Sequence, residues 1–470
     1  MQLFDRIWLL ATVFLAATGL SSASSAADAA KPNIVVILGD DLGWGELGAQ
    51  GNKEIPTPNI DSIASGGIKF TNGYVSGPYC SPTRAGLMTG RYQTRFGHEF
   101  NPGGPRAQEG LPLEEKTIAD HLRAAGYATG AIGKWHLGAQ PAFRPSKRGF
   151  DDFYGTLANS AFFHPEIVDT RKSDDPVKVT EEGFYTTDAY AARAVEWIGE
   201  HKAEPFFLYL PFNAQHAPLQ ATQKYLDRFP DIKDSKRKTF AAMMSALDDA
   251  VGQVLTSLEK NGVAENTLVV FLTDNGGPTG QTTSSNLPLR GFKATTLEGG
   301  VRVPFYVQWK GHLPAGKVYE HPVIQLDILP TALALAGAPA SESDILDGVN
   351  LLPYLEGNEQ GPPHESLYWR FGQQWAVREG DWKLVASRID GLKPQLFNLA
   401  DDIGEANDLT AENPEKVAEL KAQWDEWNEG NVPAKWTPDP KKKPGAKKGP
   451  GAKKGKAGRR ARKAARAAAS

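Results

Sequence analysis

The chain has 470 residues, 40% of them hydrophobic and 23% charged, with a single cysteine at position 80. One cysteine excludes an internal disulfide framework, and no segment after residue 30 is apolar for long enough to cross a bilayer. The formal net charge is −3, but residues 441–470 hold 13 Lys and Arg and no acid, which leaves −16 for the rest of the chain.

The N-terminal segment has the residue order of a signal peptide. Arg6 precedes an apolar stretch at 7–17, and small residues follow at 21–30. The apolar stretch is about half as long as a membrane span requires. We therefore expect residues 1–30 to be a signal peptide and the protein to be exported, either to the periplasm or out of the cell, with no transmembrane anchor.

Four short apolar runs are expected to form central strands. They lie at 34–38, 128–132, 206–210 and 268–272 and alternate with amphipathic helical stretches. Nearly continuous apolar runs of this length are typical of parallel strands that are covered by helices on both faces. We therefore predict an α/β domain over residues 31–364, built on a large, mainly parallel sheet.

Each of these runs is followed by polar residues. In chain order they are Asp40 and Asp41, Lys134 and His136, His216, and Asp274 and Asn275. Because ligands bind outside the carboxyl ends of the strands in an open α/β sheet, these side chains are expected to share one crevice. A single Asp at a strand end is often only a turn or helix cap. The coincidence of four polar strand ends favours a functional site.

The oxygen-bearing members of this set predict a metal site. Three carboxylates and one amide suit a hard cation, calcium or magnesium, better than zinc; they belong to Asp40, Asp41, Asp274 and Asn275. The positive side chains would lie opposite the cation; they are Arg84, Lys134, His136 and His216. An anion held between the cation and these groups is the expected ligand.

The lone cysteine lies near the start of a predicted helix. Pro82 suits the first helical position, residues 83–88 are helical in pattern, and Gly90 is the expected stop. Cys80 would then lie close to a helix N-terminus, which favours negative charge on a nucleophile or a bound oxyanion. The alternative is an inert thiol that packs as a small hydrophobic group.

The pattern changes after residue 364. Short strands are predicted at 367–370, 375–378, 382–385 and 395–398. An amphipathic helix is predicted at 414–427, with Asn413 as its cap and Pro414 as its first residue. We expect residues 365–436 to form a C-terminal α+β subdomain, a small antiparallel sheet with a terminal helix.

Residues 437–470 form a basic tail that cannot bury a core and is expected to be disordered. Two interpretations stay open. The tail is either simply solvated, or it is attracted to polyanions such as sulfated glycan, an acidic cell envelope or nucleic acid. Composition alone does not choose between them.

Two motifs resemble those of a known family. The Cys-Ser-Pro-Thr-Arg stretch at 80–84 resembles the Cys-x-Pro-x-Arg modification signature of formylglycine-dependent, arylsulfatase-type sulfatases of the alkaline phosphatase superfamily. The Gly-Lys-Trp-His-Leu-Gly stretch at 133–138 resembles their second signature. The resemblance extends from about residue 32 to 427. It implies an alkaline-phosphatase-like fold and makes residues 31–364 the catalytic domain of a sulfuric ester hydrolase.

The resemblance also implies a chemistry. A formylglycine-generating or sulfatase-maturating enzyme would oxidise Cys80 to Cα-formylglycine, whose hydrated gem-diol attacks sulfur through one oxygen and expels sulfate through the other. One calcium ion would be bound by Asp40, Asp41, Asp274, Asn275 and the modified Cys80. Arg84 and Lys134 would hold the formylglycine side chain, and His136 would contact its hydroxyl. His216 and Lys293 would bind the sulfate, with His216 as proton donor to the leaving alcohol.

The expected substrate is a sulfated carbohydrate or an aryl sulfate. The loops most suited to contact it span residues 93–106, 158–175 and 277–289. Candidate contacts in or near these loops are Arg95, His98 and His164, and candidate sugar-stacking aromatics are Phe162, Phe163 and Trp375. The same residue types also serve as packing or solvated surface groups, so each keeps a structural alternative.

Two other functions compete with this interpretation. A phosphonate or phosphate monoester hydrolase of the same superfamily can share the cysteine signature, although one metal suits the lower charge of a sulfate ester. A catalytically silent glycan-binding relative would keep the fold without the chemistry.

Overall fold

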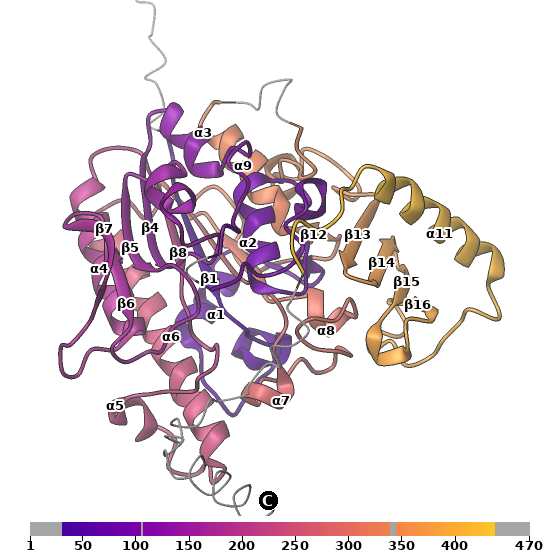
Figure 1. The fold of residues 1–470 in the computed structure, drawn as a ribbon, viewed down its shortest axis with the longest axis horizontal. Helices are drawn as coiled ribbons and strands as arrows, with labels where there is room; N and C mark the ends of the chain where they lie inside the picture. The colour runs from indigo at the N-terminus through magenta and orange to yellow at the C-terminus, as the bar shows by residue number, and fades with distance from the viewer. Residues whose placement is uncertain (1–30, 105–106, 339–344, 438–470) are drawn as a thin grey trace, which may run out of the picture.

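The computed structural model of the protein describes residues 31–104, 107–338 and 345–437. The predicted signal peptide and the basic tail from residue 438 onward lie outside the described residues. Within these, the chain forms a ten-stranded sheet, a two-stranded sheet and a four-stranded sheet (Figure 1). No helix among the described residues has the length and apolarity that a membrane crossing requires.

The large sheet has the strand order β11-β2-β10-β9-β1-β8-β4-β5-β6-β7. Its strands are β1 (Asn33–Gly39), β2 (Ile68–Phe70), β4 (Ala128–Lys134), β5 (Asp152–Thr156), β6 (Glu166–Asp169), β7 (Ser173–Lys178), β8 (Phe206–Pro211), β9 (Thr267–Thr273), β10 (Phe305–Gln308) and β11 (Lys317–Tyr319). The neighbours β9, β1, β8, β4 and β5 are parallel, whereas β10, β6 and β7 add antiparallel pairs, so the sheet is mixed. The four predicted strands are four consecutive members of the parallel core.

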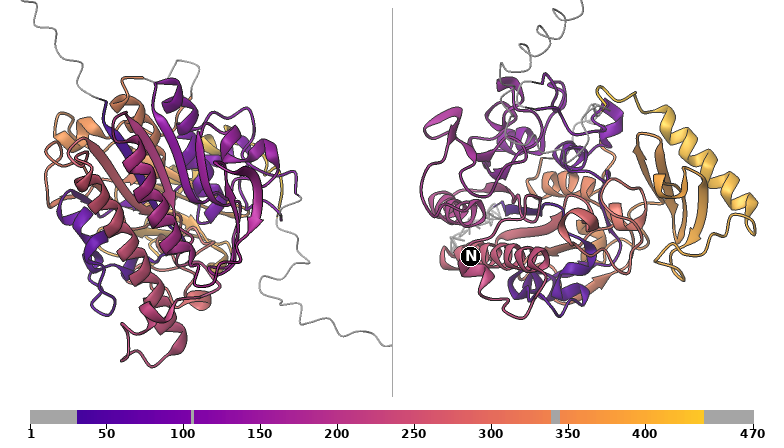
Figure 2. Two further views of the ribbon diagram at one scale, coloured as in Figure 1. Left: turned by 90° about the vertical axis from the view of Figure 1, so that its left-hand side faces the viewer. Right: turned by 60° about the horizontal axis from the view of Figure 1, so that its bottom comes forward.

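Helices cover both faces of this sheet (Figure 2). One face packs against α1 (Pro58–Ser65), α4 (Thr186–His201) and α6 (Ser235–Lys260), and the other against α2 (Cys80–Thr89), α3 (Ile118–Ala124) and α9 (Ile328–Leu335). Shorter elements are α5 (Gln223–Leu226), α7 (Thr279–Thr282), α8 (Glu298–Val301), α10 (Leu352–Glu356), β3 (Gly73–Tyr74), β12 (Val323–Ile324) and the 3-10 helices η1 (Trp44–Glu46), η2 (Gly48–Gln50), η3 (Gln93–Phe96), η4 (Pro141–Phe143), η5 (Pro145–Lys147), η6 (Gln325–Asp327) and η7 (Arg388–Asp390).

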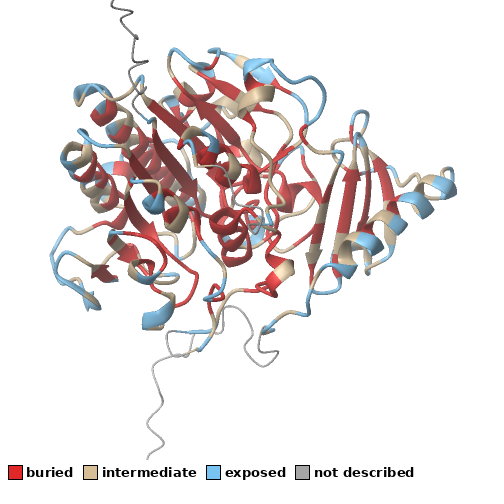
Figure 3. Ribbon diagram, turned by 90° about the horizontal axis from the view of Figure 1, so that it is seen from above, coloured by how far each residue is buried: buried red, intermediate tan, exposed pale blue. Residues whose placement is uncertain are grey.

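The apolar run of β1 is continuous because both of its faces are buried. Ile34 and Val36 point into the core beneath α2, whereas Val35 and Ile37 point into the core beneath α4 and α6. Successive side chains of a strand alternate between faces, so a strand between two helix layers has no polar face. Figure 3 shows the central strands buried throughout. Each such side chain contributes about 1.5–3 kcal/mol through burial.

The C-terminal elements confirm the predicted antiparallel sheet and terminal helix. The strands β13 (Ser366–Phe371), β14 (Gln374–Glu379), β15 (Trp382–Ala386) and β16 (Pro394–Asn398) form a meander, and α11 (Pro414–Glu429) follows with Asn413 at its N-cap. One face of this sheet packs on the large domain, and the other packs on α11, which lies outermost in Figures 1 and 2. The domain boundary at 364/365 stays a prediction.

A buried ion network joins this sheet to the large domain. The Lys383 ammonium of β15 lies 2.7 Å from Glu298 of α8 and 2.9 Å from Glu405. Burial raises the pKa of Glu405 to about 7, because the attraction of Lys383 is opposed by the like charge of Glu298. At Glu298 burial acts in the same direction, but Lys383, Arg302 and Arg378 outweigh it and lower its pKa to about 2.

Replacing Glu405 is therefore expected to change how stability depends on pH. The pKa of Glu405 in the folded protein lies above its ordinary value of 4.5. The stabilisation of the folded state that follows from this raised pKa is therefore complete below pH 4.5 and is lost as the pH rises through 7. Over this range the free energy of unfolding should fall by about 1–3 kcal/mol more in the wild type than in Glu405→Gln. Urea titrations at several pH values measure this free energy, and Glu426→Gln, a change at an exposed glutamate, is the control. Equal slopes in the wild type and Glu405→Gln would contradict the prediction.

Candidate active site

Cys80 is the first residue of α2, which ends at Gly90 with a φ of 63°. The prediction that Pro82 opens the helix is therefore wrong by two residues. Tyr79 is extended, and its carbonyl accepts a hydrogen bond of 3.1 Å from the Thr83 amide, which closes the first turn around Cys80. Pro82 still fits, because amides of the first helical turn need no intrahelical acceptor. Cys80 is fully buried, and burial raises the pKa of its thiol.

The structure brings the polar strand ends together around Cys80. Its thiol donates to Asp40 Oδ1 at 3.5 Å, and Lys293 Nζ donates to its Sγ at 3.1 Å. Because β1 and β9 pair in register with Gly39 opposite Thr273, the residues that follow them are neighbours across the sheet. The cluster unites all the predicted site residues: Asp40, Asp41, Cys80, Arg84, Lys134, His136, His216, Asp274, Asn275 and Lys293.

Buried carboxylates and cations alternate in this cluster. Arg84 donates to Asp274 Oδ2 through Nε at 3.0 Å and Nη2 at 2.8 Å. Lys134 is paired with Asp40, and Lys293 Nζ lies 2.5 Å from Asp41 Oδ1.

The neighbouring cations lower the pKa of Asp40 below its ordinary value, but they do not do so for Asp274. Burial raises the pKa of Asp40, but Lys134, His216 and Arg84 together outweigh it and lower that pKa to about 2. Burial and the charge of Asp40 raise the pKa of Asp274 despite its contact with Arg84. An additional positive charge near Asp274 would therefore stabilise its ionised form.

The acceptors left over in this cluster fit a hard cation. Asp41 Oδ2 and Asn275 Oδ1 are buried, and neither accepts a hydrogen bond from any described residue. Asn275 Nδ2 donates to Asp41 Oδ1 at 2.8 Å. Asp40, Asp41, Cys80 and His216 each offer a ligand atom, and these atoms lie within 4.8 Å of one another. Because burying an unpaired acceptor costs free energy, an oxygen-binding cation would satisfy what the protein leaves open.

The two histidines present different nitrogens. His216 Nδ1 lies 2.6 Å from the Ala217 carbonyl, which can only accept, so Nδ1 carries the proton and Nε2 points toward Asp41 Oδ2 at 3.6 Å. His136 has a φ of 62°, and its Nδ1 is buried without a partner among the described residues. Burial, with Lys134 and Arg84 adding to it, lowers the pKa of His136 well below its ordinary value, so this ring is neutral.

Ser81, the residue next to Cys80, is held by two contacts that the sequence did not predict. Ser81 Oγ donates to the His136 carbonyl at 2.7 Å and lies 2.6 Å from His98 Nε2. His98 was a predicted substrate contact, and this prediction is wrong because the ring is fully buried. Burial lowers its pKa to about 3, so a neutral His98 donates to Ser81 and fixes the residue next to Cys80.

The segment after α11 returns to this support. Trp436 packs edge-on against His98 with ring centroids 4.7 Å apart, and its indole N–H donates to the Asn101 carbonyl at 3.0 Å. The Asn101 side chain in turn accepts from the Ser81 amide at 3.0 Å. Arg95, another predicted substrate contact, instead stacks on Trp427 at 5.4 Å. The only sequence signal was a tryptophan just before the basic tail.

The aromatic residues proposed to stack on a sugar are packed elsewhere. Phe162 and Phe163 lie 5.8 and 5.4 Å from Tyr185, and Phe162 is fully buried. Trp375 of β14 lies 4.9 Å from Trp424 of α11. These contacts assign all of them to the core or its margin. His164 is exposed and remains a candidate for substrate contact.

This fold, with an anion cradle and a hard-cation ligand set at the ends of parallel strands, is the architecture of α/β enzymes that cleave charged esters. Residues 32–338 match the family model described as Sulfatase. The chain therefore belongs to the sulfatase family, sulfuric ester hydrolases of the alkaline phosphatase superfamily.

Similar proteins extend over most of the chain. Human N-acetylgalactosamine-6-sulfatase is 32% identical over 460 residues, covering 86% of this chain and 87% of that protein. Human arylsulfatase A is 36% identical over 395 residues, covering 77% and 76%. The crystal structure of Ps i-CgsB has 38% identity and a TM-score of 0.82, covering 86% and 94%. A phosphonate monoester hydrolase of Agrobacterium radiobacter, at 19% identity and a TM-score of 0.62, shares the fold alone.

Calcium is expected to stabilise the folded protein through the unsatisfied acceptors. At about 100 times its Kd it should raise the free energy of unfolding by about 2.7 kcal/mol. Asp41→Asn should lose most of this increment, because it neutralises one proposed ligand. Thermal unfolding with and without chelator measures it, and the exposed Asp231→Asn is the matched control. A larger increment with zinc, or an undiminished one in Asp41→Asn, would count against an oxygen-ligated calcium site.

Proposed function

We propose that the protein hydrolyses sulfate esters of a sulfated carbohydrate, using Cα-formylglycine made from Cys80 and one calcium ion. The observation that carries the proposal is the position of Cys80, buried at the first residue of α2 between Asp40 and Lys293. Burial raises the pKa of the thiol, which disfavours a thiolate nucleophile and supports a role as precursor. When bound, calcium supplies Lewis acidity, and hydrated formylglycine supplies the attacking oxygen.

The residues around Cys80 take distinct roles in this proposal. Arg84 and Lys134 orient the side chain at position 80, and Lys293 holds a sulfate oxygen, since its ammonium already lies 3.1 Å from Sγ. His216 delivers a proton to the leaving alcohol from Nε2 when it is in the imidazolium form, because in the neutral ring the single proton lies on Nδ1, which faces the Ala217 carbonyl. His136 accepts a proton at Nδ1, which has no other described partner. We assign Asp40, Asp41, Asp274 and Asn275, with residue 80, to the calcium ion.

A carbohydrate substrate is supported by the similar proteins. One is named N-acetylgalactosamine-6-sulfatase, and Ps i-CgsB, at 37% identity over 87% of this chain, was also solved in complex with k-i-k-neocarrahexaose. A phosphonate or phosphate monoester hydrolase remains the alternative, and relative turnover of aryl sulfate and aryl phosphonate separates the two. A silent glycan binder is disfavoured because no position of the predicted site is missing.

We also propose that residues 1–30 export the protein and that a formylglycine-generating or sulfatase-maturating enzyme oxidises Cys80.

The basic tail is proposed to increase the attraction of the enzyme to polyanions. It begins just after Trp436, which contacts the loop that supports Ser81. Its 13 basic residues would attract polyanionic glycan or envelope. Deleting 441–470 should lower the salt concentration that elutes the enzyme from sulfated polymers. Unchanged elution would refute this role.

The modification of Cys80 can be tested by mass. A peptide that spans Cys80, taken from protein made in its native host, should be lighter than the thiol form by the change from CH2SH to CHO. Purified protein should also release free sulfate from an aryl sulfate, whereas Cys80→Ala should release none above background. The native host is required because another host can lack the maturating enzyme. An intact thiol in active native protein would refute the formylglycine proposal.

The proposed proton donor can be tested by varying the leaving group. His216→Gln should lower kcat/KM on a sugar sulfate by about 10²–10⁴-fold. The loss should be much smaller on 4-nitrophenyl sulfate, because nitrophenolate leaves without protonation. His312→Gln, a histidine that stacks on Trp309, serves as control. Equal losses on both substrates would instead assign His216 to sulfate binding alone.

A further inference from the structure

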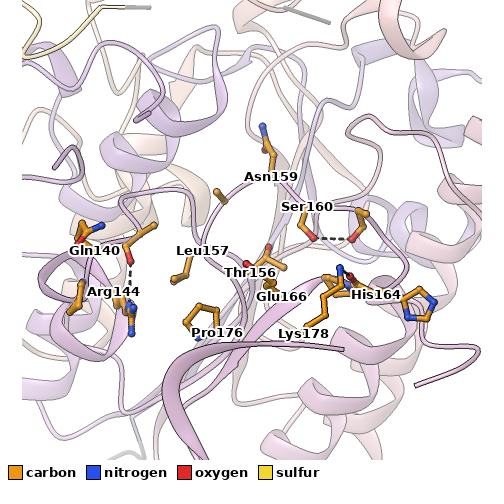
Figure 4. Close-up of a pocket in the computed structure, with 15 residues that line it drawn as sticks. Gln140, Arg144, Thr156, Leu157, Asn159, Ser160, His164, Glu166, Pro176 and Lys178 are labelled. Carbon is orange, nitrogen blue, oxygen red and sulfur yellow. Dashed lines mark hydrogen bonds between the residues drawn. The ribbon is translucent and has the colours of Figure 1, made fainter. Parts of the chain in front are cut away.

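A cavity lies beside the site, at the carboxyl end of β5 (Figure 4). It has a volume of about 460 Å³, within the range of about 300–1,000 Å³ that small-ligand pockets occupy. Its walls are the loop after β5, the segment that leads into η4, and the β6–β7 hairpin. The polar side chains that line it are Gln140, Arg144, Thr156, Asn159, Ser160, His164, Glu166 and Lys178.

This cavity shares a wall with the catalytic cluster. Thr156 pairs with Lys134 in the parallel register of β4 and β5. The next residue, Leu157, accepts a hydrogen bond of 3.1 Å from the His136 amide through its carbonyl. Both Thr156 and Leu157 line the cavity. A molecule that extends from an ester at Cys80 across the end of β5 would therefore enter it.

Each of the two cations that line the cavity, Arg144 and Lys178, has carboxylate neighbours. Arg144 Nη1 lies 3.2 Å from Asp175 and 3.4 Å from Asp174. Lys178 faces Glu166 across the β6–β7 register and donates to the His164 carbonyl. Of these carboxylates only Glu166 lines the cavity, but Asp174 and Asp175 already pair with Arg144 from outside the lining. The charges of Arg144 and Lys178 are thus compensated by neighbouring carboxylates, which leaves no surplus of positive charge in the lining to favour an anion.

The lining instead suits hydroxyl groups. The Asn159 amide can both donate and accept, the Ser160 hydroxyl accepts because it already donates to the Ala161 carbonyl at 2.8 Å, Lys178 donates, and Glu166 accepts. Vicinal hydroxyls of a sugar need this mixture, because each is a donor and an acceptor at once. Figure 4 shows Lys178 and His164 side by side, with Glu166 nearby. No Phe, Tyr or Trp of the described residues lines the cavity, so recognition there depends mainly on hydrogen bonds.

We propose that this cavity binds the sugar residue linked to the sulfated one, and that it binds this residue as an uncharged polyol. The inference rests on the proposed sulfatase activity and adds a specificity to it. Substrates whose neighbouring sugar is unsulfated are preferred over those in which that sugar carries a second sulfate.

The test compares kcat/KM for 4-nitrophenyl sulfate with kcat/KM for pairs of sulfated disaccharides that differ only in a sulfate on the neighbouring sugar. The wild type should favour the unsulfated neighbour by about tenfold or more. Lys178→Met and Asn159→Ala should each lower the ratio of disaccharide to aryl kcat/KM by about tenfold, through KM, since each removes hydrogen bonds to the second sugar. Lys172→Met removes a lysine of the same hairpin that lies outside the cavity, and it should leave the ratio unchanged.

The outcomes separate the two proposals. A wild type that releases no sulfate from any ester refutes the proposed function and the inference with it. A wild type that cleaves the aryl sulfate but prefers the doubly sulfated member, or gains nothing from any second sugar, refutes the inference alone. The same holds if Lys178→Met and Lys172→Met behave alike.

Discussion

The balance of charge inside the strand-end cluster is the constraint on which the rest of the structure depends. Three carboxylates and three cations are buried together: Asp40, Asp41 and Asp274 with Arg84, Lys134 and Lys293. An isolated buried charge would cost several kcal/mol, and removing one partner of a buried pair costs about 3–5 kcal/mol. The residues directly after β1 and β9 supply all three carboxylates, whereas the cations come from α2, β4 and the loop before α8, so the cluster ties these elements together.

This balance also explains the position of the cysteine. Cys80 lies where the carboxylates of β1 meet Lys293, and Ser81 beside it is fixed by His98 and Asn101. The last described segment of the chain completes that support through Trp436. Cys80 is thus held from the sheet on one side and from the last described segment on the other. Rigid support of this kind is what electrostatic catalysis requires, because preorganised groups need no rearrangement as charge develops.

The elements that can be predicted from the sequence are those whose burial requires a recognisable pattern of apolar residues along the chain. The run at 34–38 is apolar because both faces of β1 are covered, and Asp40 is noticeable because it breaks that run. The start of α2 was misplaced, since Pro82 tolerates the third helical position as well as the first. His98 and Arg95 could not be assigned, because their partners Trp436 and Trp427 lie more than 300 residues away. The cavity beside β5 depends on a polar hairpin that has no alternating pattern.

The cluster around Cys80 and the cavity beside β5 therefore compensate their charged groups in different ways. The cluster at Cys80 is balanced without a metal, so a bound divalent cation adds an excess of positive charge that only an anion can compensate. In the cavity beside it, Arg144 is already paired with Asp174 and Asp175, and Lys178 faces Glu166. The proposal is therefore that an anionic ester is favoured at one position and disfavoured at the next, although the two positions share the end of β5. The proposed selectivity among several sulfates of one glycan follows from this contrast rather than from overall attraction to a polyanion.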